Sequence, residues 1–385
     1  MELIELGTIL HMEKGKKPQA QSKQPSEGYL PYVDIKAFEQ GVIENYATTE
    51  KSLLCEDGDL LIVCDGSRSG LTGRAIKGVV GSTLSKIYAD GLTTEYLRYF
   101  IQSKYTMLNT QKKGTGTPHL NANILKASKL IVPPLEEQER IVSRIEELFS
   151  SLDNAVETLR KTKEQLAVYR QAVLESCIGE GDIYPILNCV EEMGQGWSPK
   201  CIRTPVLNDD EWAVITTTAV QPLNFLFEEN KKLPEDLEAR PKHELNVGDI
   251  LITRAGPRSR CGVCCMVRKT KKKLMNCDKV YRIIVKKDMI LPEYLEAVLN
   301  SPAFQKEIAF CKTGGSDSGV NLTQDRFLNI NIPVPNIDTQ SLILSEIANR
   351  VSVCDSIERT VDTALTQAEA MRQSILKEAF EGRLA

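Results

Sequence analysis

The stretch IVPPLEEQERIVSRIEELFSSLDNAVETLRKTKEQLAVYRQAVLESCI, residues 131–178, decides the fold. Its opening prolines, Pro133 and Pro134, suit the position just before a helix or in its first turn. From Ile141 to Val173 apolar side chains recur in steps of four and three residues, apart from a polar Thr162. A sustained 3.5-residue repeat indicates a coiled-coil helix, which would be roughly 50 Å long at 1.5 Å per residue.

The same pattern occurs a second time, 202 residues later. The stretch IPVP, residues 332–335, precedes a second heptad-patterned segment, and Tyr169-Arg-Gln-Ala-Val-Leu174 is matched by Met371-Arg-Gln-Ser-Ile-Leu376. The two predicted seams share one phase. They comprise Ile141, Ile145, Leu148, Leu152, Leu159 and Leu166 in the first copy, and Ile343, Ile347, Ile357, Val361, Met371 and Ile375 in the second.

The repetition extends over the whole chain. Three further pairs of segments match at offsets of 181, 190 and 198: Gly15-Lys-Lys-Pro18 with Gly196-Trp-Ser-Pro199, the GD-apolar segments 58–66 and 248–256, and Glu95-Tyr-Leu97 with Glu293-Tyr-Leu295. The offset rises steadily along the chain. This is what two copies of one unit produce when the second has acquired loop insertions.

Each copy combines a globular part with a long helix. Short apolar runs with β-branched residues, bounded by Gly, Pro, Asn and Asp, predict strands, and residues 94–110 and 292–310 predict amphipathic helices. The sequence therefore predicts an α+β protein with two pseudo-symmetric α/β globular domains, at 1–134 and 179–335. Helices at 135–178 and 336–385 separate them. These helices should pack as an antiparallel coiled coil if a two-fold relates the copies, although each could instead cover only its own domain.

Composition sets the class of protein. A chain of 385 residues is too long for one typical core, and 42 % hydrophobic with 26 % charged residues is ordinary for a soluble globular protein. There is no run of about 18 apolar residues and no signal-peptide pattern, so we expect no membrane span and a cytoplasmic protein. Eleven cysteines without regular spacing indicate reduced, buried thiols. Only one close pair, Cys261 and Cys264, precedes Cys277, and structural zinc usually needs two pairs.

The charge is unevenly distributed. The helical segments carry a net charge of −6 and the remainder +2, within a total of −4. Basic residues cluster between Arg254 and Arg282, in and after a glycine-punctuated loop that follows a GD-apolar strand; the first copy has GSRSGLTGR in the same place. Such loops suit DNA, because glycine lets backbone N–H groups approach phosphates and arginine can read guanine.

We predict DNA contacts from this charge pattern and from the corresponding segments of the two copies. A solvated surface hairpin is the alternative explanation. The predicted residues are Lys16, Lys17, Ser67, Arg68, Ser69, Arg74, Lys77, Lys112, Lys113, Thr115, Lys200, Arg203, Arg254, Arg258, Ser259, Arg260, Lys271, Lys272 and Lys312.

The motifs of common catalytic sites are missing from the sequence. There is no phosphate-binding G-x-x-x-x-G-K-[ST], no G-x-S-x-G and no H-E-x-x-H, and only three histidines occur. We therefore expect neither catalytic residues nor a bound metal or cofactor.

The repeated blocks resemble a known family. Ile131-Val-Pro-Pro-Leu-Glu-Glu-Gln-Glu-Arg-Ile141, the heptad helix after it, and the second copy ending Arg372-Gln-Ser-Ile-Leu-Lys-Glu-Ala-Phe-Glu-Gly-Arg-Leu384 look like the specificity subunit of Type I restriction-modification enzymes. The second copy departs from the first at Pro335-Asn-Ile-Asp-Thr-Gln340, which has one extra residue and lacks the Glu before Gln. That departure affects only where the helix begins.

The resemblance implies a non-catalytic subunit. Each globular target recognition domain would read one half of a split double-stranded DNA sequence. The helices would set the spacing and dock methyltransferase subunits, two of them in all, which bring S-adenosylmethionine. Restriction subunits would join with ATP and Mg²⁺, and this chain would hold none of these cofactors.

Two other functions remain open from the residues alone. A standalone DNA-binding regulator would use the same basic loops without a partner on the helices. A coiled-coil interaction scaffold that binds no DNA would leave the basic cluster between Arg254 and Arg282 without a role.

Overall fold

The computed structural model describes residues 3–113, 118–179 and 181–383. The chain divides into two compact units. Unit 1 comprises residues 1–160 and 362–385, and unit 2 comprises residues 161–361. Across the described ranges, no helix combines the length and apolar character that crossing a membrane requires.

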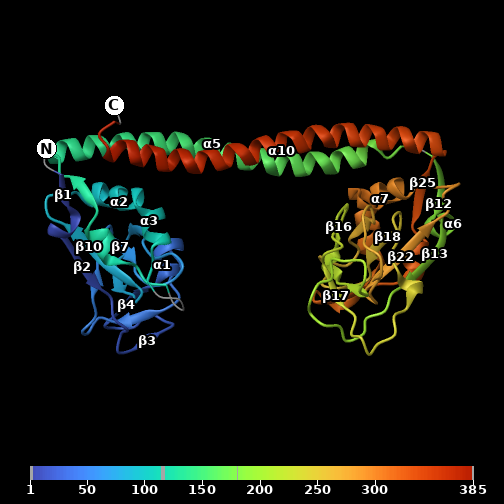
Figure 1. Ribbon diagram of the computed structural model, residues 1–385, viewed down its shortest axis with the longest axis horizontal. Coiled ribbons are helices and arrows are strands. Elements are labelled where there is room, and N and C mark those ends of the chain that lie inside the picture. The colour runs from blue at the N-terminus through green and yellow to red at the C-terminus, as the bar shows by residue number, and fades with distance from the viewer. Residues whose placement is uncertain (1–2, 114–117, 180, 384–385) are drawn as a thin grey trace. The chain divides into compact units, whose positions relative to one another are not determined.

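Two long helices run through the division between the units (Figure 1). Helix α5 spans Leu135–Cys177 and helix α10 spans Ile337–Phe380. Each contributes one segment to unit 1 and one to unit 2, so that a pair of helical segments accompanies each globular part.

The centre of unit 1 is a four-stranded antiparallel sheet. Its strands are β2 (Leu10–Lys14), β10 (Leu84–Ala89), β7 (Leu60–Val63) and β8 (Thr72–Arg74), in the order β2-β10-β7-β8. Every residue of β7 is buried, as its unbroken apolar run predicts. This strand leads directly into the glycine-punctuated loop, so the sheet determines where that loop begins.

The other elements of unit 1 surround this sheet. They are β1 (Leu3–Glu5), η1 (Leu6–Thr8), β3 (Gln21–Ser22), β4 (Tyr29–Val33), α1 (Ile35–Gln40), β5 (Tyr46–Thr48), β6 (Leu54–Cys55), β9 (Gly78–Val80), α2 (Thr94–Ser103), α3 (Tyr105–Thr110), α4 (Ala122–Lys126) and β11 (Lys129–Ile131). Strands β3-β5-β4-β9-β6 form a second sheet, and β1 pairs with β11.

Unit 2 repeats the central sheet strand by strand. Its order is β13-β22-β18-β20, where β13 is Val190–Gln195, β22 is Val280–Val285, β18 is Ile250–Thr253 and β20 is Cys264–Met266. Each strand follows the same sequence landmarks as its counterpart in unit 1. The internal repeat predicted from the rising offsets is therefore present in the fold.

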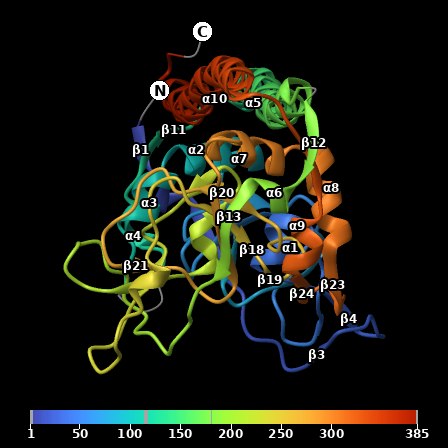
Figure 2. The ribbon, with the colours of Figure 1, turned by 90° about the vertical axis from the view of Figure 1, so that its right-hand side faces the viewer.

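Unit 2 also contains the insertions that the rising offsets indicate. Its other elements are β12 (Asp182–Pro185), α6 (Ile186–Cys189), β14 (Ala213–Ile215), η2 (Thr217–Ala219), β15 (Val220–Gln221), β16 (Asn224–Phe225), β17 (Asn230–Lys232), η3 (Pro241–His243), β19 (Ala255–Gly256), β21 (Leu274–Met275), α7 (Pro292–Asn300), α8 (Pro302–Cys311), β23 (Lys312–Ser316), β24 (Gly319–Leu322), α9 (Gln324–Leu328) and β25 (Asn331–Val334). Figure 2 shows α7 between the helix pair and the sheet.

A buried glutamine holds each long helix to its own globular part. In unit 1 the Gln138 side chain accepts a hydrogen bond from Thr93 N and donates to the carbonyl oxygens of Gly91 and Pro133. In unit 2 Gln340 makes the equivalent bonds, from Leu291 N and to the carbonyl oxygens of Met289 and Pro335.

Both glutamines are fully buried, and they are 202 residues apart. The extra residue in the second proline block therefore leaves this contact intact. A tyrosine reinforces each connection: Tyr96 and Tyr294 donate from their hydroxyls to Ile131 O and Pro333 O.

The helical segments run antiparallel within each unit. In unit 2 Lys163 pairs with Glu358 at 3.6 Å, Arg170 with Asp355 at 2.6 Å, and Gly179 approaches Ile343, so rising numbers on α5 meet falling numbers on α10. In unit 1 Asp153 pairs with Arg372, the equivalent of the Arg170–Asp355 pair. The predicted α+β class with an antiparallel helix pair is confirmed.

At two positions of the predicted seam on α10, the next residue in the chain faces the partner helix instead. Ile145 and Val361 are buried where the seam predicts them, but Ile357 is 41 % exposed and Met371 is 54 % exposed. Their neighbours Glu358 and Arg372 are the residues that face the partner helix, through ion pairs. The prediction for Ile357 and Met371 was wrong because charged side chains can cover a seam with their apolar stems.

Candidate nucleic-acid interface

In unit 1 the loop after β7, residues 64–71, folds against residues 112–113 and 118–121. Gly66 N donates to Pro118 O at 2.8 Å, and Leu120 N donates to Cys64 O at 2.7 Å. Lys112 Nζ donates to Ser67 O at 2.7 Å, and the Asn109 amide donates to the same carbonyl. These bonds bring the predicted residues Ser67, Arg68 and Lys112 together on one surface.

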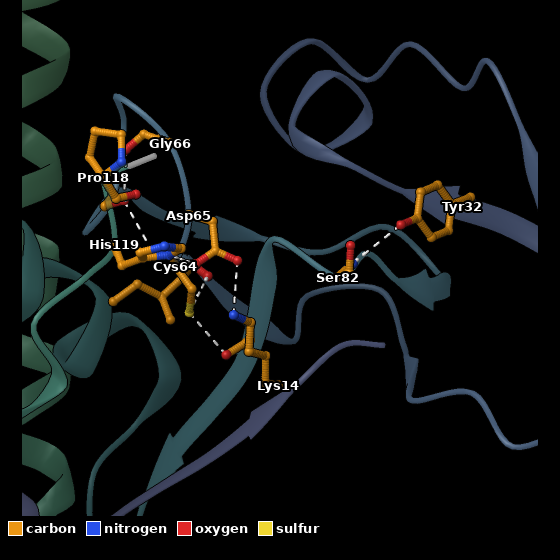
Figure 3. Close-up of polar contacts among 11 residues, drawn as sticks. Lys14, Tyr32, Cys64, Asp65, Gly66, Ser82, Pro118 and His119 are labelled. Carbon is orange, nitrogen blue, oxygen red and sulfur yellow. Dashed lines mark hydrogen bonds and ion pairs between the residues drawn. The ribbon is translucent and has the colours of Figure 1, made fainter. Parts of the chain in front are cut away.

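An aspartate lies at the centre of this arrangement (Figure 3). The Asp65 carboxylate accepts hydrogen bonds from Lys14 Nζ at 2.8 Å and from His119 Nδ1 at 2.6 Å. Burial by itself raises the pKa of Asp65, but the hydrogen bonds from Lys14 and His119 outweigh it and hold the pKa below its ordinary value. The link between strand β2 and the two loops therefore persists at neutral pH, and weakens as the pH falls through the depressed pKa.

Unit 2 has the same two-loop construction with different side chains. The loop after β18 contains β19, which pairs with β24 in the second loop: Ala255 is opposite Asn321. Arg258 donates from its backbone N to Asp317 O at 2.9 Å and from Nε to Asp317 Oδ1 at 2.8 Å. Lys312 Nζ lies 3.3 Å from Arg258 O and donates to it. The predicted residues Arg258 and Lys312 are thus brought together.

A glycine beside each loop pair has no room for a side chain. A Cβ on Gly15 would lie 2.2 Å from Gly81 O, and one on Gly196 would lie 2.1 Å from Asn276 O. Gly15 N donates to Leu84 O in strand β10, and Gly196 N donates to Cys277 O in the segment between β21 and β22. At both positions the backbone lies so close to a neighbouring backbone segment that only glycine fits, which explains why Gly15 and Gly196 match at the offset of 181.

Other predicted residues are exposed at separate places. Lys16, Lys17, Lys113, Lys200, Arg203, Ser259 and Lys272 are exposed. Arg74 and Lys77 are exposed too, but they lie at the opposite end of β7 from the loop, and they pair with Glu95 and Glu56. Thr115 lies outside the described residues. DNA contact by these residues stays a prediction.

Two predicted contacts need correction because their side chains are buried. Lys271 is 5 % exposed, and its ammonium group donates to the carbonyl oxygens of Glu211 and Lys272. Ser69 is fully buried, and its hydroxyl donates to Cys64 O and Gly66 O. Lys271 and Ser69 shape the loops from inside and do not face solvent.

Two arginines of the basic cluster also make internal bonds. The Arg260 guanidinium donates to Thr217 O, Val220 O and Gln221 Oε1. Arg254 donates from Nη1 to Asp278 O and lies over the Tyr281 ring. Both are half-buried, so their first role is to hold the loop of unit 2, and DNA contact remains an additional prediction.

Sequence reasoning missed the acidic partners of the basic residues. Arg68 pairs with Glu39, Arg258 with Asp317, and Lys14 with Asp65. These partners come from segments distant in the sequence, and no local motif marks them. The described ranges contain no group of three or more His, Cys, Asp or Glu side chains placed to share a metal ion.

Sequence comparison matches the chain to specificity proteins of Type I restriction systems. Residues 1–167 match the family model described as the Type I restriction modification DNA specificity domain. The EcoEI specificity subunit of Escherichia coli is 38 % identical over 46 % of this chain and 30 % of its own length. The MjaVIII specificity subunit of Methanocaldococcus jannaschii is 25 % identical over 100 % of this chain and 92 % of its own.

In sequence the chain is therefore similar to Type I restriction enzyme specificity subunits. The fold agrees: a chain from a structural study of complex assembly and conformational transition in the type I R-M system has a TM-score of 0.73 at 18 % identity, over 99 % of this chain and 98 % of that one. The HsdS subunit from Thermoanaerobacter tengcongensis has a TM-score of 0.53 at 17 % identity, over 99 % and 97 %.

Proposed function

We propose that this chain is the DNA-recognition subunit of a Type I restriction-modification complex in the cytoplasm. The domain at 1–134 reads one half of a bipartite target, and the domain at 179–335 reads the other. The observation that carries the proposal is the two-loop surface built twice on the same sheet, each time beside a glutamine-anchored helix.

The two surfaces differ in the side chains that would meet DNA. Unit 1 presents Arg68 and Lys112 from its loops, and Lys14 at the end of β2 bonds Asp65. Unit 2 has Ala255 in place of Asp65 and presents Arg258 and Lys312. Because bases are distinguished by the donors and acceptors offered to them, the two half-sites should differ in sequence.

DNA binding is tested at the exposed residues of unit 2. We expect the double variant Arg258→Ala/Lys312→Ala to weaken DNA binding and to reduce the slope of log affinity against log salt by about two, since each lost phosphate contact removes about one. Arg258 is exposed and its partner Asp317 is on the surface, so the fold should be unaffected. Affinity is measured by fluorescence anisotropy at several salt concentrations.

The control for this experiment is Arg350→Ala. Arg350 is exposed on α10 and pairs with Glu346 of the same helix. Its replacement removes one positive charge, as each single substitution in the double variant does, but leaves the loops untouched. We expect the control to retain the salt slope of the unmodified chain. A slope unchanged in the double variant would remove the unit 2 loops from the proposed interface.

The helices carry the proposed docking surface for methyltransferase subunits, two in the complex, with restriction subunits joining later. In unit 2 Val353 is 60 % exposed and lies one turn before Ile357 on α10. Arg170 of α5 and Glu358 of α10 face each other and pair at 2.7 Å. Tyr169 and Ile357 each come one residue before this pair. In an antiparallel helix pair, the residues just before two facing residues lie on the same side of the interface, so Tyr169 and Ile357 share one surface. An exposed apolar surface of this kind marks a protein contact.

Partner docking is tested by the double variant Val353→Ser/Ile357→Ser. We expect its association with a methyltransferase subunit to weaken about tenfold, or about 1.4 kcal/mol, because apolar contact area is lost. The matched control is Leu342→Ser, which is 71 % exposed on the same helix. Sedimentation of the mixed subunits gives the dissociation constants, and equal values for the three chains would place docking elsewhere.

The alternative functions predict different results in the same assays. A standalone regulator binds DNA but forms no complex with a methyltransferase subunit on size exclusion. An interaction scaffold shows no salt-dependent DNA binding.

A further inference from the structure

Unit 2 contains an apolar cavity of about 390 Å³ where α7 faces the helix pair. Its wall is formed mainly by small or aliphatic side chains: Leu174, Ala297, Leu344, Ile347, Ala348 and Val351. Arg170 and Arg268 line it as well, and Arg268 is paired with the buried Glu296.

The internal repeat shows what fills the equivalent place in unit 1. By the offsets of 198 and 202, Ala297 corresponds to Tyr99 and Val351 to Phe149. The Tyr99 and Phe149 rings are buried and meet edge to face, with centroids 5.7 Å apart. Ala348 corresponds to Glu146, whose carboxylate accepts a hydrogen bond from the Tyr99 hydroxyl at 3.3 Å. Three large side chains in unit 1 are thus replaced by three small ones around the cavity.

The cation beside the rings is retained in unit 2. In unit 1 Arg372 lies over the Phe149 ring at 4.5 Å and pairs with Asp153. Its equivalent, Arg170, pairs with Asp355 and lines the cavity, but Val351 stands where the ring would be. A guanidinium group over an open apolar wall is suited to an aromatic face.

We propose that this cavity is a binding site for a small uncharged aromatic molecule of one or two rings. Its volume lies in the range of about 300–1,000 Å³ that is usual for small-molecule sites. Apolar cavities tend to stay dry and accept aromatic guests, because water finds too few hydrogen-bonding partners there. The ligand takes the place that Tyr99 and Phe149 occupy in unit 1, with the Arg170 guanidinium against its face. The proposal goes beyond DNA recognition and does not depend on it.

The probe that tests the site is 5-fluoroindole, observed by ¹⁹F NMR with the full chain. We expect its line to broaden in the presence of the unmodified protein, and the broadening to be lost in Ala297→Tyr/Val351→Phe, which restores both unit 1 rings. The matched control, Val168→Phe, adds the same bulk as Val351→Phe at a position on α5 that is 70 % exposed and outside the cavity wall, and should leave the broadening unchanged.

Three results would overturn the proposal. They are the absence of broadening with the unmodified chain, equal broadening with the filled variant, and loss of the probe when a methyltransferase subunit is added, since a partner side chain would then be the occupant. Circular dichroism checks the fold of each variant. If the double variant does not fold, the single variant Val351→Phe is used instead. A reduction of the broadening by at least several-fold supports the proposal, and a smaller change contradicts it.

Discussion

Replacing Gln340 with alanine is expected to lower the free energy of unfolding of unit 2 by about 2–4 kcal/mol. The Gln340 side chain is fully buried and satisfies Leu291 N, Met289 O and Pro335 O. Truncation leaves these backbone groups buried without that partner, and an unsatisfied buried group costs about 1–3 kcal/mol before relaxation. The start of α10 should then detach from the globular part more easily.

Both tryptophans of the chain, Trp197 and Trp212, belong to unit 2, so their fluorescence during urea unfolding reports on this unit. The control is Gln165→Ala, an exposed glutamine on the α5 segment of the same unit. Its unfolding midpoint should stay close to that of the unmodified chain. Equal midpoints for all three proteins would show that the buried glutamine does not hold the helix.

Lengthening both long helices is expected to lengthen the gap between the half-sites. We consider insertion of one heptad after Arg160 in α5 and another after Val361 in α10, where the division between the units falls. Seven residues keep both seams in phase and add roughly 10 Å to each helix at 1.5 Å per residue. Because one base pair rises about 3.4 Å, the gap should grow by about three base pairs.

The half-site bases should remain the same in this variant, because the loops of both units are untouched. Sequencing of the methylated adenines in a host that carries the variant gives the gap directly. A heptad inserted in the exposed loop after Glu235 is the control, and it should leave the gap unchanged. Full activity with the original gap, or altered half-site bases, would contradict the spacing role of the helices.

The repeat and the long helices follow from the sequence because they rest on local patterns. Proline blocks, heptad steps and GD-apolar strands recur at offsets that rise steadily along the chain, and the fold repeats the central sheet strand by strand. The exact seam does not follow, because Arg170 and Glu358 reach the interface as an ion pair while the apolar Ile357 stays outside. Hydrophobic periodicity cannot show whether a charged pair or its apolar neighbour faces the partner helix.

The candidate site is predictable only in part. The glycine-punctuated loops and the exposed Arg68 and Arg258 carry local signals, but their acidic partners Glu39 and Asp317 lie on distant segments. Burial of Lys271 also depends on the carbonyl oxygen of Glu211, sixty residues away in the chain. Such contacts depend on tertiary packing, and one sequence without its fold does not reveal them.

The central claim is that the two units read two different half-sites for a partner methyltransferase. Its most direct test is genome-wide mapping of methylated adenines in a host that expresses this chain with a methyltransferase subunit, compared with the same host expressing the methyltransferase alone. The account predicts one bipartite motif, with two unequal half-sites and a gap of fixed length, that appears only when this chain is present. A single continuous motif, or methylation that does not depend on this chain, would contradict it.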